Sequence, residues 1–373
     1  MSHESAEIEP ERIPERLKAL GALERVREAA GGVPVYLVGG GVRDLLLGRE
    51  RTDLDIAVEG DAVELGKRLG GEIRAHERFA TATAVLDGLE LDLATARSET
   101  YPRPGALPEV RPATLAEDLA RRDFTVNAMA VPLLAAPELI DPHGGAPDLE
   151  RGVLRVLHER SFVDDPTRAL RAARYAARYG FSVEPDTERL LRTADLSTVS
   201  SERVEAELRK LAAEPRARES FELLDEWGLV ALETGAPELI DVVSDLAGSE
   251  PWRSAVRRDD AVLAAALARD LEAARELAAS EPQRPSQAVA RARAHDAVTL
   301  ALARGLGAEW LDHYVSEWRG VRLEIDGGDL LEAGIPEGPA IGRGLAAALR
   351  AKLDGEIAGR DAELRVALGA ARG

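Results

Sequence analysis

Cysteine is absent from the 373-residue chain, which excludes disulfide bonds and thiolate metal sites. No apolar run approaches the roughly 20 residues of a transmembrane helix, and the polar, acidic N-terminus does not resemble a signal peptide. Lysine is scarce, with four lysines among 48 basic residues. These features predict a cytoplasmic protein that binds no membrane, and nothing in the sequence indicates a protein partner.

The charge of the chain gives two opposing indications about nucleic acid. The formal net charge of −19 argues against a nucleic-acid partner. Between Arg151 and Arg178, however, seven arginines accompany three acidic residues. Such a basic stripe can bind a phosphate backbone, although an arginine-rich helix is equally often only a solvated surface.

The composition changes along the chain and predicts an α+β protein of two or more domains. Strand candidates alternate with short helices up to about residue 158, and helices rich in Ala, Leu, Arg and Glu follow. One amphipathic helix is predicted from Pro14 to Ala30. We divide the chain into an N-terminal tail and helix (1–32), a head with a small mixed sheet (33–158) and three helical segments (159–232, 233–325 and 326–373).

A glycine turn followed by two aspartates is the most informative segment. An apolar strand candidate runs into Gly39 and Gly40, and a second strand follows with Asp53 and Asp55 two residues apart. Because side chains alternate along a strand, the two carboxylates lie on one face and the apolar residues on the other. Two like charges so close together repel unless a cation binds them, and oxygen ligands suit Mg²⁺. An isolated D-x-D pattern would more often be a solvated edge strand.

Two other nucleotide-binding loops fit this segment poorly. The glycines lack the G-x-G-x-x-G spacing of a Rossmann fold, and the acidic pair follows too early to bind a ribose. A Walker A loop is excluded because no G-K-[ST] follows.

A third carboxylate is predicted on a neighbouring strand. The segment Leu89–Thr95 alternates cleanly, with Asp92 on its polar face. Three carboxylates from neighbouring strands can hold two Mg²⁺ ions, which clamp an attacking hydroxyl and a leaving pyrophosphate. An exposed strand aspartate without a function is the alternative.

The segment RRDFTVNA (121–128) combines groups that bind a nucleotide. Arg122 at a helix end offers a fork of donors to a triphosphate. Asp123 can accept a hydrogen bond from a ribose hydroxyl, and Asn127 can bridge sugar and phosphate.

The segment DDPTR (164–168) indicates which bases are bound. Asp165 and Arg168 lie three residues apart on one helix face, so an acceptor stands beside a donor. Cytosine and adenine each present an amino donor beside a ring-nitrogen acceptor, which this pair complements. Guanine and uracil present the reverse order and would leave buried groups unpaired. The alternative is an N-cap aspartate with an i,i+3 ion pair.

Together the three segments resemble the polymerase-beta-like nucleotidyltransferase superfamily. VGGGVRDLLLGRERTDLDIAV (38–58), RRDFTVNA and DDPTR are similar to motifs of the class II bacterial tRNA nucleotidyltransferases (CCA-adding enzymes) and bacterial poly(A) polymerases. DPHGGAPDL (141–149) is similar to the segment that links the head to the neck. The resemblance is strong over residues 35–230, modest over 325–373 and nearly absent between them.

The resemblance implies a nucleotidyltransferase head followed by a helical neck that recognises the base, a body and a tRNA-binding tail. It implies Mg²⁺-dependent, template-independent transfer of nucleotides from CTP and ATP to the 3′ end of tRNA, with release of pyrophosphate. Asp53, Asp55 and Asp92 would be catalytic, and Asp53 and Asp55 would bind the metal. The implied nucleotide-binding residues are Gly39, Gly40, Arg43, Arg122, Asp123, Asn127, Asp165, Arg168, Arg171 and Arg174.

Alternatives remain within and outside this family. Residues 99–110 (ETYPRPGALPEV) differ from the connector of many full CCA-adding enzymes, which leaves open addition of CC only or of the final A only. A poly(A) polymerase shares the head motifs but usually carries a basic C-terminal extension. From another class, the chain would be a non-catalytic RNA- or nucleotide-binding protein, against which the intact acidic and arginine motifs argue.

Overall fold

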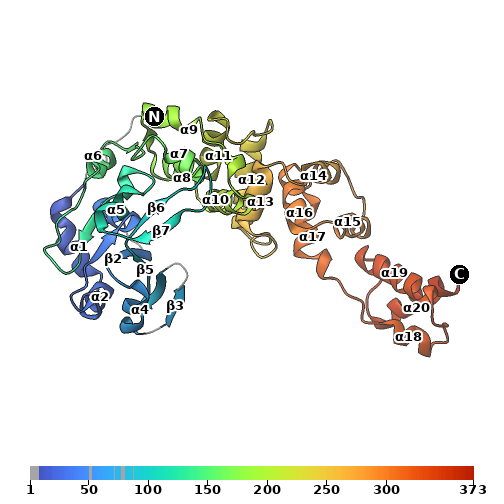
Figure 1. Cartoon of the computed structure of the whole chain (residues 1–373). Coiled ribbons are helices and arrows are strands. Elements are labelled where there is room, and N and C mark those ends of the chain that lie inside the picture. Colours follow the sequence, from blue (N-terminus) through green and yellow to red (C-terminus); the bar gives the residue numbers. More distant parts are fainter. Residues whose placement is uncertain (1–7, 50–52, 71, 77–79, 87) are drawn as a thin grey trace. The chain divides into compact units, whose positions relative to one another are not determined.

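The chain folds into two compact units, Met1–Leu229 and Val230–Gly373. The computed structural model describes residues 8–49, 53–70, 72–76, 80–86 and 88–373, and the side chains of Asp53 and His76 lie outside that description. Within the described ranges, none of the helices is both long and apolar enough to cross a bilayer. The expected α+β head and the helical remainder are confirmed (Figure 1). The finer division into head, neck, body and tail stays a prediction.

A six-stranded mixed sheet forms the centre of the first unit, in the order β3-β4-β5-β2-β1-β8. Strands β2 and β5 are parallel, and the other neighbours are antiparallel. The strands are β1 (Val35–Val38), β2 (Asp53–Val58), β3 (Glu72–His76), β4 (Thr81–Leu86), β5 (Leu89–Thr95) and β8 (Ala130–Pro132).

The alternation expected along β2 and β5 gives the sheet two different faces. Leu91 and Leu93 are buried on the face that helix α4 (Ala62–Leu69) covers, where Gly66 packs closely on Leu93. On the opposite face, helix α5 (Leu115–Ala120) packs on apolar residues at one end of the sheet. Asp55, Glu90 and Asp92 are the charged residues of β2 and β5 whose side chains the structure describes, and all three are exposed. A cavity described below lies over this face.

The glycine turn starts a short helix at its second glycine. Helix α3 runs Gly40–Leu46, and Gly39 precedes it with φ +64°. Glycine adopts this backbone conformation without the strain that a side chain would introduce.

The segment after β5 forms a hairpin and a capped helix. Strands β6 (Arg97–Thr100) and β7 (Glu109–Pro112) pair antiparallel, and residues 101–108 connect them. Helix α5 follows, and a capping box between Thr114 and Glu117 begins it. A 3₁₀ turn, η3 (Thr125–Asn127), then leads into β8.

Helices complete the first unit. Both α10 (Ser201–Ala213) and α11 (Ala217–Glu226) pack on helix α8 (Thr167–Tyr179). Gly180 ends α8 in the left-handed conformation. The remaining elements are α6 (Gly145–Glu150), β9 (Val153–Leu154), α7 (Ser161–Asp164), β10 (Ser182–Val183), α9 (Pro185–Leu191) and η4 (Leu196–Thr198).

The single N-terminal helix predicted from Pro14 to Ala30 is wrong. A 3₁₀ turn, η1 (Pro10–Arg12), leads into α1 (Ile13–Ala19), and α2 (Ala22–Ala30) follows as a separate helix. The break falls at Leu20 and Gly21, where Leu20 has a non-helical ψ of 77°. Glycine is a poor helix former, so tertiary packing determines whether a helix continues through such a position.

The second unit is helical throughout, as expected. Its C-terminal part has a core of its own, formed by Ile325, Leu330, Ile335, Ala348, Ala367 and Ala371. The elements are α12 (Ala236–Gly248), α13 (Arg258–Ala266), α14 (Leu271–Ala278), α15 (Pro285–Ala292), α16 (Ala297–Gly305), α17 (Trp310–Ser316), η5 (Trp318–Gly320), α18 (Gly327–Glu332), α19 (Pro339–Leu353) and α20 (Arg360–Arg372).

Candidate active site

A cavity of about 680 Å³ lies between the polar face of the sheet and the helices that follow it in the first unit. Ten of the predicted site residues line this cavity, although they come from β2, β5, the glycine turn, the α5–η3 segment, α8 and the residue that follows α7. They are Gly39, Gly40, Asp55, Asp92, Arg122, Asp123, Asn127, Asp165, Arg168 and Arg171. The side chain of Asp53 lies outside the described residues, and Arg43 and Arg174 are not part of the lining.

Two carboxylates stand side by side on the floor of the cavity. Asp55 and Asp92 are registered partners in the parallel pair of β2 and β5, so their side chains leave the sheet on the same face. Oδ1 of Asp92 accepts a hydrogen bond from Thr83 Oγ1 on β4 at 2.7 Å. The described residues contain no group of three or more potential metal ligands. Two adjacent carboxylates are nevertheless hard oxygen ligands of the kind that Mg²⁺ prefers.

The glycine turn brings the backbone close to this pair. A Cβ atom placed on Gly39 would lie 3.7 Å from Oδ2 of Asp55 and 2.5 Å from Nη1 of Arg122. The turn therefore places an arginine next to a carboxylate. A glycine is required here both for the positive φ and for the close approach.

Asp118 fixes the arginine pair at the end of α5. Its Oδ1 accepts from Arg121 Nη2 at 2.7 Å, and its Oδ2 accepts from Arg122 Nη2 at 2.9 Å. Burial raises the pKa of Asp118, but Arg122 and Arg121 together hold it below its ordinary value. Arg122 is thus oriented before any ligand binds.

Asp123 connects the head to α8. Its Oδ2 accepts from Arg171 Nε at 3.0 Å, and its Oδ1 accepts from Asn127 Nδ2 at 3.0 Å. Burial raises the pKa of Asp123, whereas Arg171 and the hydrogen bond from Asn127 lower it, and the net shift is downward. Arg171 Nη2 also lies 3.5 Å from Oδ2 of Asp165, so one guanidinium joins two carboxylates.

Arg43 lies behind the cavity wall, whereas the resemblance implies contact with the nucleotide. Its guanidinium donates to Asn127 Oδ1 at 2.6 Å and to Asp44 at 2.8 Å, and it lies 4.3 Å from the ring centre of Tyr179. Arg43 is 4% exposed. It orients Asn127 rather than lining the cavity.

The two oxygens of Asp165 have different surroundings. Oδ1 accepts from the backbone N–H and the hydroxyl of Thr167 at 3.1 and 2.6 Å, and from Arg203 Nη2 at 3.0 Å. Among the described residues, Oδ2 has only the long contact with Arg171 Nη2 at 3.5 Å. Burial raises the pKa of Asp165, but Arg171, Thr167 and Arg203 lower it below its ordinary value, so the group is a carboxylate at neutral pH. Oδ2 therefore retains capacity to accept.

Arg168 is held by main-chain and hydroxyl oxygens. Nη1 donates to Ser161 Oγ at 2.8 Å and to a backbone carbonyl at 3.2 Å, and Nη2 donates to the carbonyl of Arg121 at 2.7 Å. Its Nε is buried and has no hydrogen-bond partner within the described part of the chain. An unpaired buried donor beside a cavity is costly without a ligand.

The basic stripe predicted between Arg151 and Arg178 is largely neutralised by acidic neighbours. Arg174 and Arg178 both pair with Glu214, at 3.7 and 3.2 Å. Arg151 and Arg155 likewise pair with Asp148. These arginines therefore bind protein carboxylates instead of forming an open surface for phosphates, and Arg174 belongs to this group.

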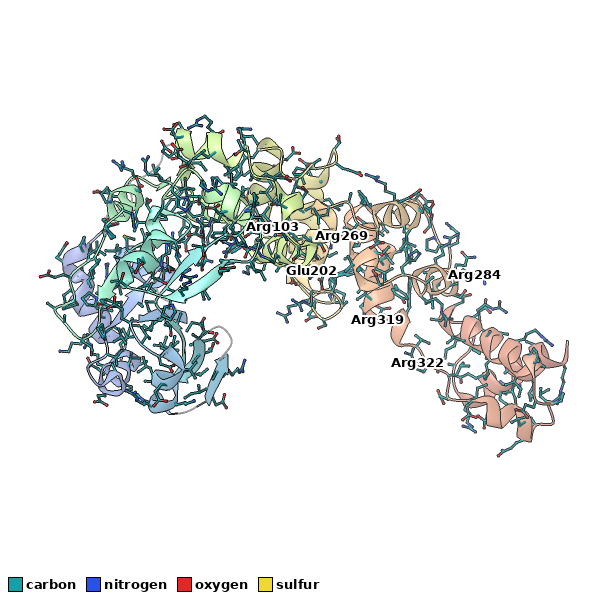
Figure 2. All side chains as sticks on the ribbon, in the orientation of Figure 1. Arg103, Glu202, Arg269, Arg284, Arg319 and Arg322 are labelled. Carbon is teal, nitrogen blue, oxygen red and sulfur yellow. The ribbon has the colours of Figure 1, made fainter. Side chains whose placement is uncertain are left out.

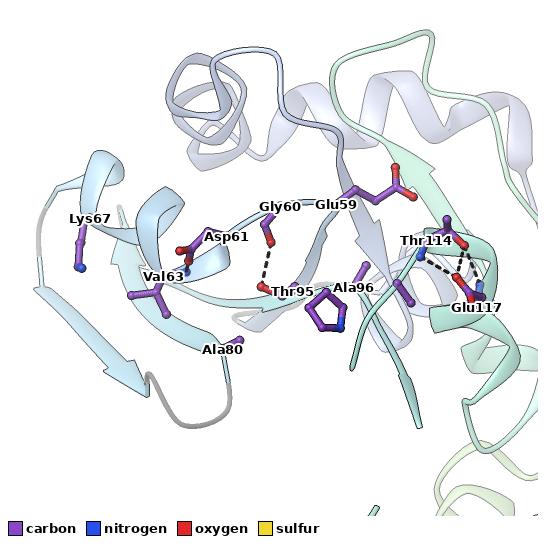
Figure 3. A pocket seen from close by; sticks show the side chains of 12 residues that line it. Glu59, Gly60, Asp61, Val63, Lys67, Ala80, Thr95, Ala96, Thr114 and Glu117 are labelled. Atoms are coloured by element: carbon purple, nitrogen blue, oxygen red, sulfur yellow. Dashed lines mark hydrogen bonds between the residues drawn. The ribbon is translucent and has the colours of Figure 1, made fainter. Parts of the chain in front are cut away.

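A second, larger cavity of about 950 Å³ lies beyond the ends of β2 and β5 (Figure 3). Apart from Lys67, the polar side chains that line it make hydrogen bonds within the protein. Thr95 donates to the carbonyl of Gly60 at 2.9 Å, and Asp61 caps α4. Thr114 and Glu117 bond to each other in the capping box. The smaller cavity carries the clustered arginines and carboxylates and is the candidate site.

Sequence reasoning did not identify several residues of the cavity as site residues. The sequence does contain a pattern that indicates Asp118. An acidic residue three and four positions before two arginines on a helix can form ion pairs with both. No local sequence pattern indicates Thr83 or Tyr101, because strand pairing and the β6–β7 hairpin bring them to the site. Burial and Glu99 raise the pKa of Tyr101 to about 12, so its hydroxyl donates to Glu99 at 2.9 Å.

Two family models match the chain. Residues 35–155 match the poly A polymerase head domain, and residues 180–238 match the probable RNA and SrmB-binding site of polymerase A. The first match includes the glycine turn, both strand carboxylates and the arginine motif.

Individual relatives agree with these matches. The chain is 44% identical over 205 residues to the A-adding tRNA nucleotidyltransferase of Halalkalibacterium halodurans, a match that covers 52% of this chain and 48% of that protein. It is 39% identical over 360 residues to the CC-adding tRNA nucleotidyltransferase of Deinococcus radiodurans, covering 92% of each. The chain spans less than half the length of the first A-adding relatives but nearly all of the CC-adding one.

A solved structure shows the same fold over almost the whole chain. The Thermotoga maritima CCA-adding enzyme, complexed with tRNA, is 30% identical with a TM-score of 0.72 and covers 96% of this chain and 98% of that one. Three findings agree on the family of this chain. They are the full-length similarity to a tRNA nucleotidyltransferase, the match to the head-domain model and this shared fold. The chain belongs to the bacterial tRNA nucleotidyltransferase and poly(A) polymerase family.

Proposed function

We propose that the chain transfers nucleotides from CTP, ATP or both to the 3′ end of tRNA, without a template. The observation that carries this proposal is the single cavity that combines adjacent strand carboxylates, arginines and the Asp165–Arg168 pair. The Thermotoga relative was solved with tRNA, and the Deinococcus relative is named as CC-adding, which supports tRNA as the acceptor.

The nucleotide would bind with its phosphates at the glycine turn and its base at α8. We assign phosphate binding to Arg122 and Arg171, because Arg174 pairs with Glu214 outside the cavity. Asp123 and Asn127 are placed for the ribose, between these two arginines. Asp118 and Asp123 orient these two arginines before the nucleotide binds.

Base selection follows from the groups that remain available. Oδ2 of Asp165 would accept from the exocyclic amine of cytosine or adenine, and Nε of Arg168 would donate to the adjacent ring nitrogen. Uracil and guanine present a carbonyl oxygen and an N–H at those positions. Each would oppose acceptor to acceptor and donor to donor, which costs about 1–3 kcal/mol per buried group.

Asp55 and Asp92, with Asp53, would hold Mg²⁺. When bound, the metal lowers the pKa of the attacking hydroxyl and stabilises charge on the phosphates. The donor set fits, since the two placed carboxylates are adjacent and bear oxygen ligands only.

The reaction forms one phosphodiester bond and breaks one phosphoanhydride bond. The 3′ hydroxyl oxygen of the RNA attacks the α-phosphorus, and pyrophosphate leaves with the bonding electrons. The hydroxyl proton passes to solvent or to a carboxylate of the cavity floor. Arg122, next to the turn at Gly39, would stabilise the charge that develops on the phosphates.

The test is a set of tRNAs that end before, within and after the CC sequence, each given CTP, ATP or both with Mg²⁺. A product that gains C, CC, A or CCA supports the proposal and identifies the variant of the activity. Long A tails on unrelated RNAs would identify a poly(A) polymerase instead. Nucleotide binding without any extended product would overturn the proposal in favour of a non-catalytic protein.

A further inference from the structure

The β6–β7 hairpin reaches from the head to the neck helices and touches them at its tip (Figure 1). Gly105 is buried in the connecting loop with φ +68°. Its N–H donates to the carbonyl of Val163 at 3.3 Å. A Cβ atom at Gly105 would lie 2.6 Å from the carbonyl oxygen of Thr198, so this contact tolerates only glycine.

One arginine joins this tip to the base-reading carboxylate. Nη1 of Arg203, on α10, donates to the carbonyl oxygen of Gly105 at 2.9 Å, and Nη2 donates to Oδ1 of Asp165 at 3.0 Å. The rigid guanidinium fork keeps the two acceptors at a fixed separation. Arg203 also lines the cavity, and its side chain is 26% exposed.

Arg203 fixes the position of Asp165 relative to other parts of the fold, which the local contacts of Asp165 do not do. Thr167 lies two residues from Asp165 and therefore fixes the carboxylate only relative to the start of α8. Arg203 comes from another helix, so it fixes Asp165 relative to α10 and the hairpin. With three donors on Oδ1, the carboxylate presents Oδ2 as its available acceptor.

We propose that Arg203 is a positioning residue for base selection, which holds Asp165 by Oδ1 against the hairpin tip so that Oδ2 reads the amino group of the base. This inference rests on the proposed function. It adds a residue to those assigned above to the phosphates and the metal, and it gives Gly105 a role as the second anchor of the same guanidinium.

The test measures kcat/KM for CTP and UTP, and for ATP and GTP, on tRNA acceptors that the wild-type protein extends. We expect Arg203→Gln to lower the preference for the amino-bearing base about tenfold, mainly by raising KM for the correct nucleotide. Arg203→Lys retains the charge and should recover part of the preference. Gly105→Ala should lower the preference similarly although Asp165 and Arg203 are both unchanged.

Two controls separate this effect from a general loss of charge or fold. Arg209→Gln removes an arginine from the same helix, where it pairs with Glu205 at 3.3 Å and does not line the cavity. Arg103→Gln changes an exposed side chain of the same loop (Figure 2). Both should leave the base preference unchanged, and thermal melting checks that every variant is folded.

A double variant tests the shared contact. If Gly105 and Arg203 act together, Arg203→Gln combined with Gly105→Ala should be no worse than the more severe single change. The inference is overturned if Arg203→Gln slows all four nucleotides equally, or leaves the preference intact. A wild-type protein that extends no tRNA would refute the proposed function instead, which is a different result.

Discussion

Asp55 and Asp92 occupy registered positions on neighbouring parallel strands, with Thr83 bonded to the second carboxylate from the strand beyond. Neighbouring strands in a sheet lie about 4.8 Å apart, so strand pairing alone brings the two carboxylates close together. Their repulsion favours a shared cation. This relationship leads to the first two predictions.

Asp55→Asn should lower the rate of nucleotide incorporation by roughly a thousandfold while leaving the melting temperature nearly unchanged, because the change removes charge and little volume. Chelation with EDTA should have the same effect in the wild type, and added Mg²⁺ should reverse it. Glu72→Gln, at an exposed position of the edge strand β3, is the matched control. Full activity of Asp55→Asn in the presence of Mg²⁺ would contradict the assignment.

Thr83→Val should reduce incorporation about fivefold, since the hydrogen bond to Asp92 contributes about 1 kcal/mol to the orientation of the carboxylate. Thr83→Ser keeps the hydroxyl and should restore the rate. The measurement is kcat at saturating nucleotide. Equal rates for the valine and serine variants would show that the bond has no part in the reaction.

Asp118→Asn should weaken nucleotide binding and change the dependence of stability on pH. The folded-state pKa of Asp118 is depressed by its arginines, so its contribution to stability is present above the unfolded pKa near 4 and is lost as pH falls through the lower folded value. The wild type should therefore lose stability below about pH 4 more steeply than the variant.

Denaturant unfolding between pH 2 and 7 measures this difference. Glu109→Gln removes an exposed carboxylate of the nearby strand β7, which caps no helix, and is the control for net charge. Parallel stability profiles for Asp118→Asn and the wild type would exclude a stabilising role for the Asp118 ion pairs.

Gly145→Ala should destabilise the first unit by about 3 kcal/mol, because the added Cβ would overlap the carbonyl of Thr125 and lie 2.9 Å from Cγ of Met129. Gly144 is the matched comparison, since it has φ +73° but open space around its Cα. Gly144→Ala should cost about 1 kcal/mol through backbone strain alone. Chemical denaturation compares the two variants, and equal losses would contradict the packing argument.

Local patterns predicted the parts of the site that depend on neighbours in sequence. The spacing of Asp53 and Asp55 and the alternation around Asp92 predicted strands with carboxylates on one face, and the register of β2 and β5 agrees. The capping box at Thr114 was also predictable, since its partners lie three residues apart. The spacing of side chains along a helix or strand is the same in every protein, so contacts between residues close in sequence can be predicted from the sequence alone.

The other features of the fold and the site depend on which helices and strands pack together, which local sequence patterns do not reveal. The break at Gly21 was missed because helix propensity is weak beside tertiary packing. Arg43 was expected to bind the nucleotide, and only the packing of α3 against η3 and α8 shows that it contacts Asn127 and Tyr179. The contact between Arg203 and Gly105 joins residues 98 positions apart, and neither has a local signal for it.

The arginines of the cavity are already bonded to protein carboxylates and carbonyls, and this has a consequence for selectivity against other anions. An incoming triphosphate has to displace or share existing partners of Arg122 and Arg171, so binding is an exchange of ligands. Small anions that offer one or two oxygens gain little from such an exchange. A polyphosphate that reaches several guanidinium groups at once gains much more, so we expect chloride and inorganic phosphate to inhibit nucleotide binding only weakly.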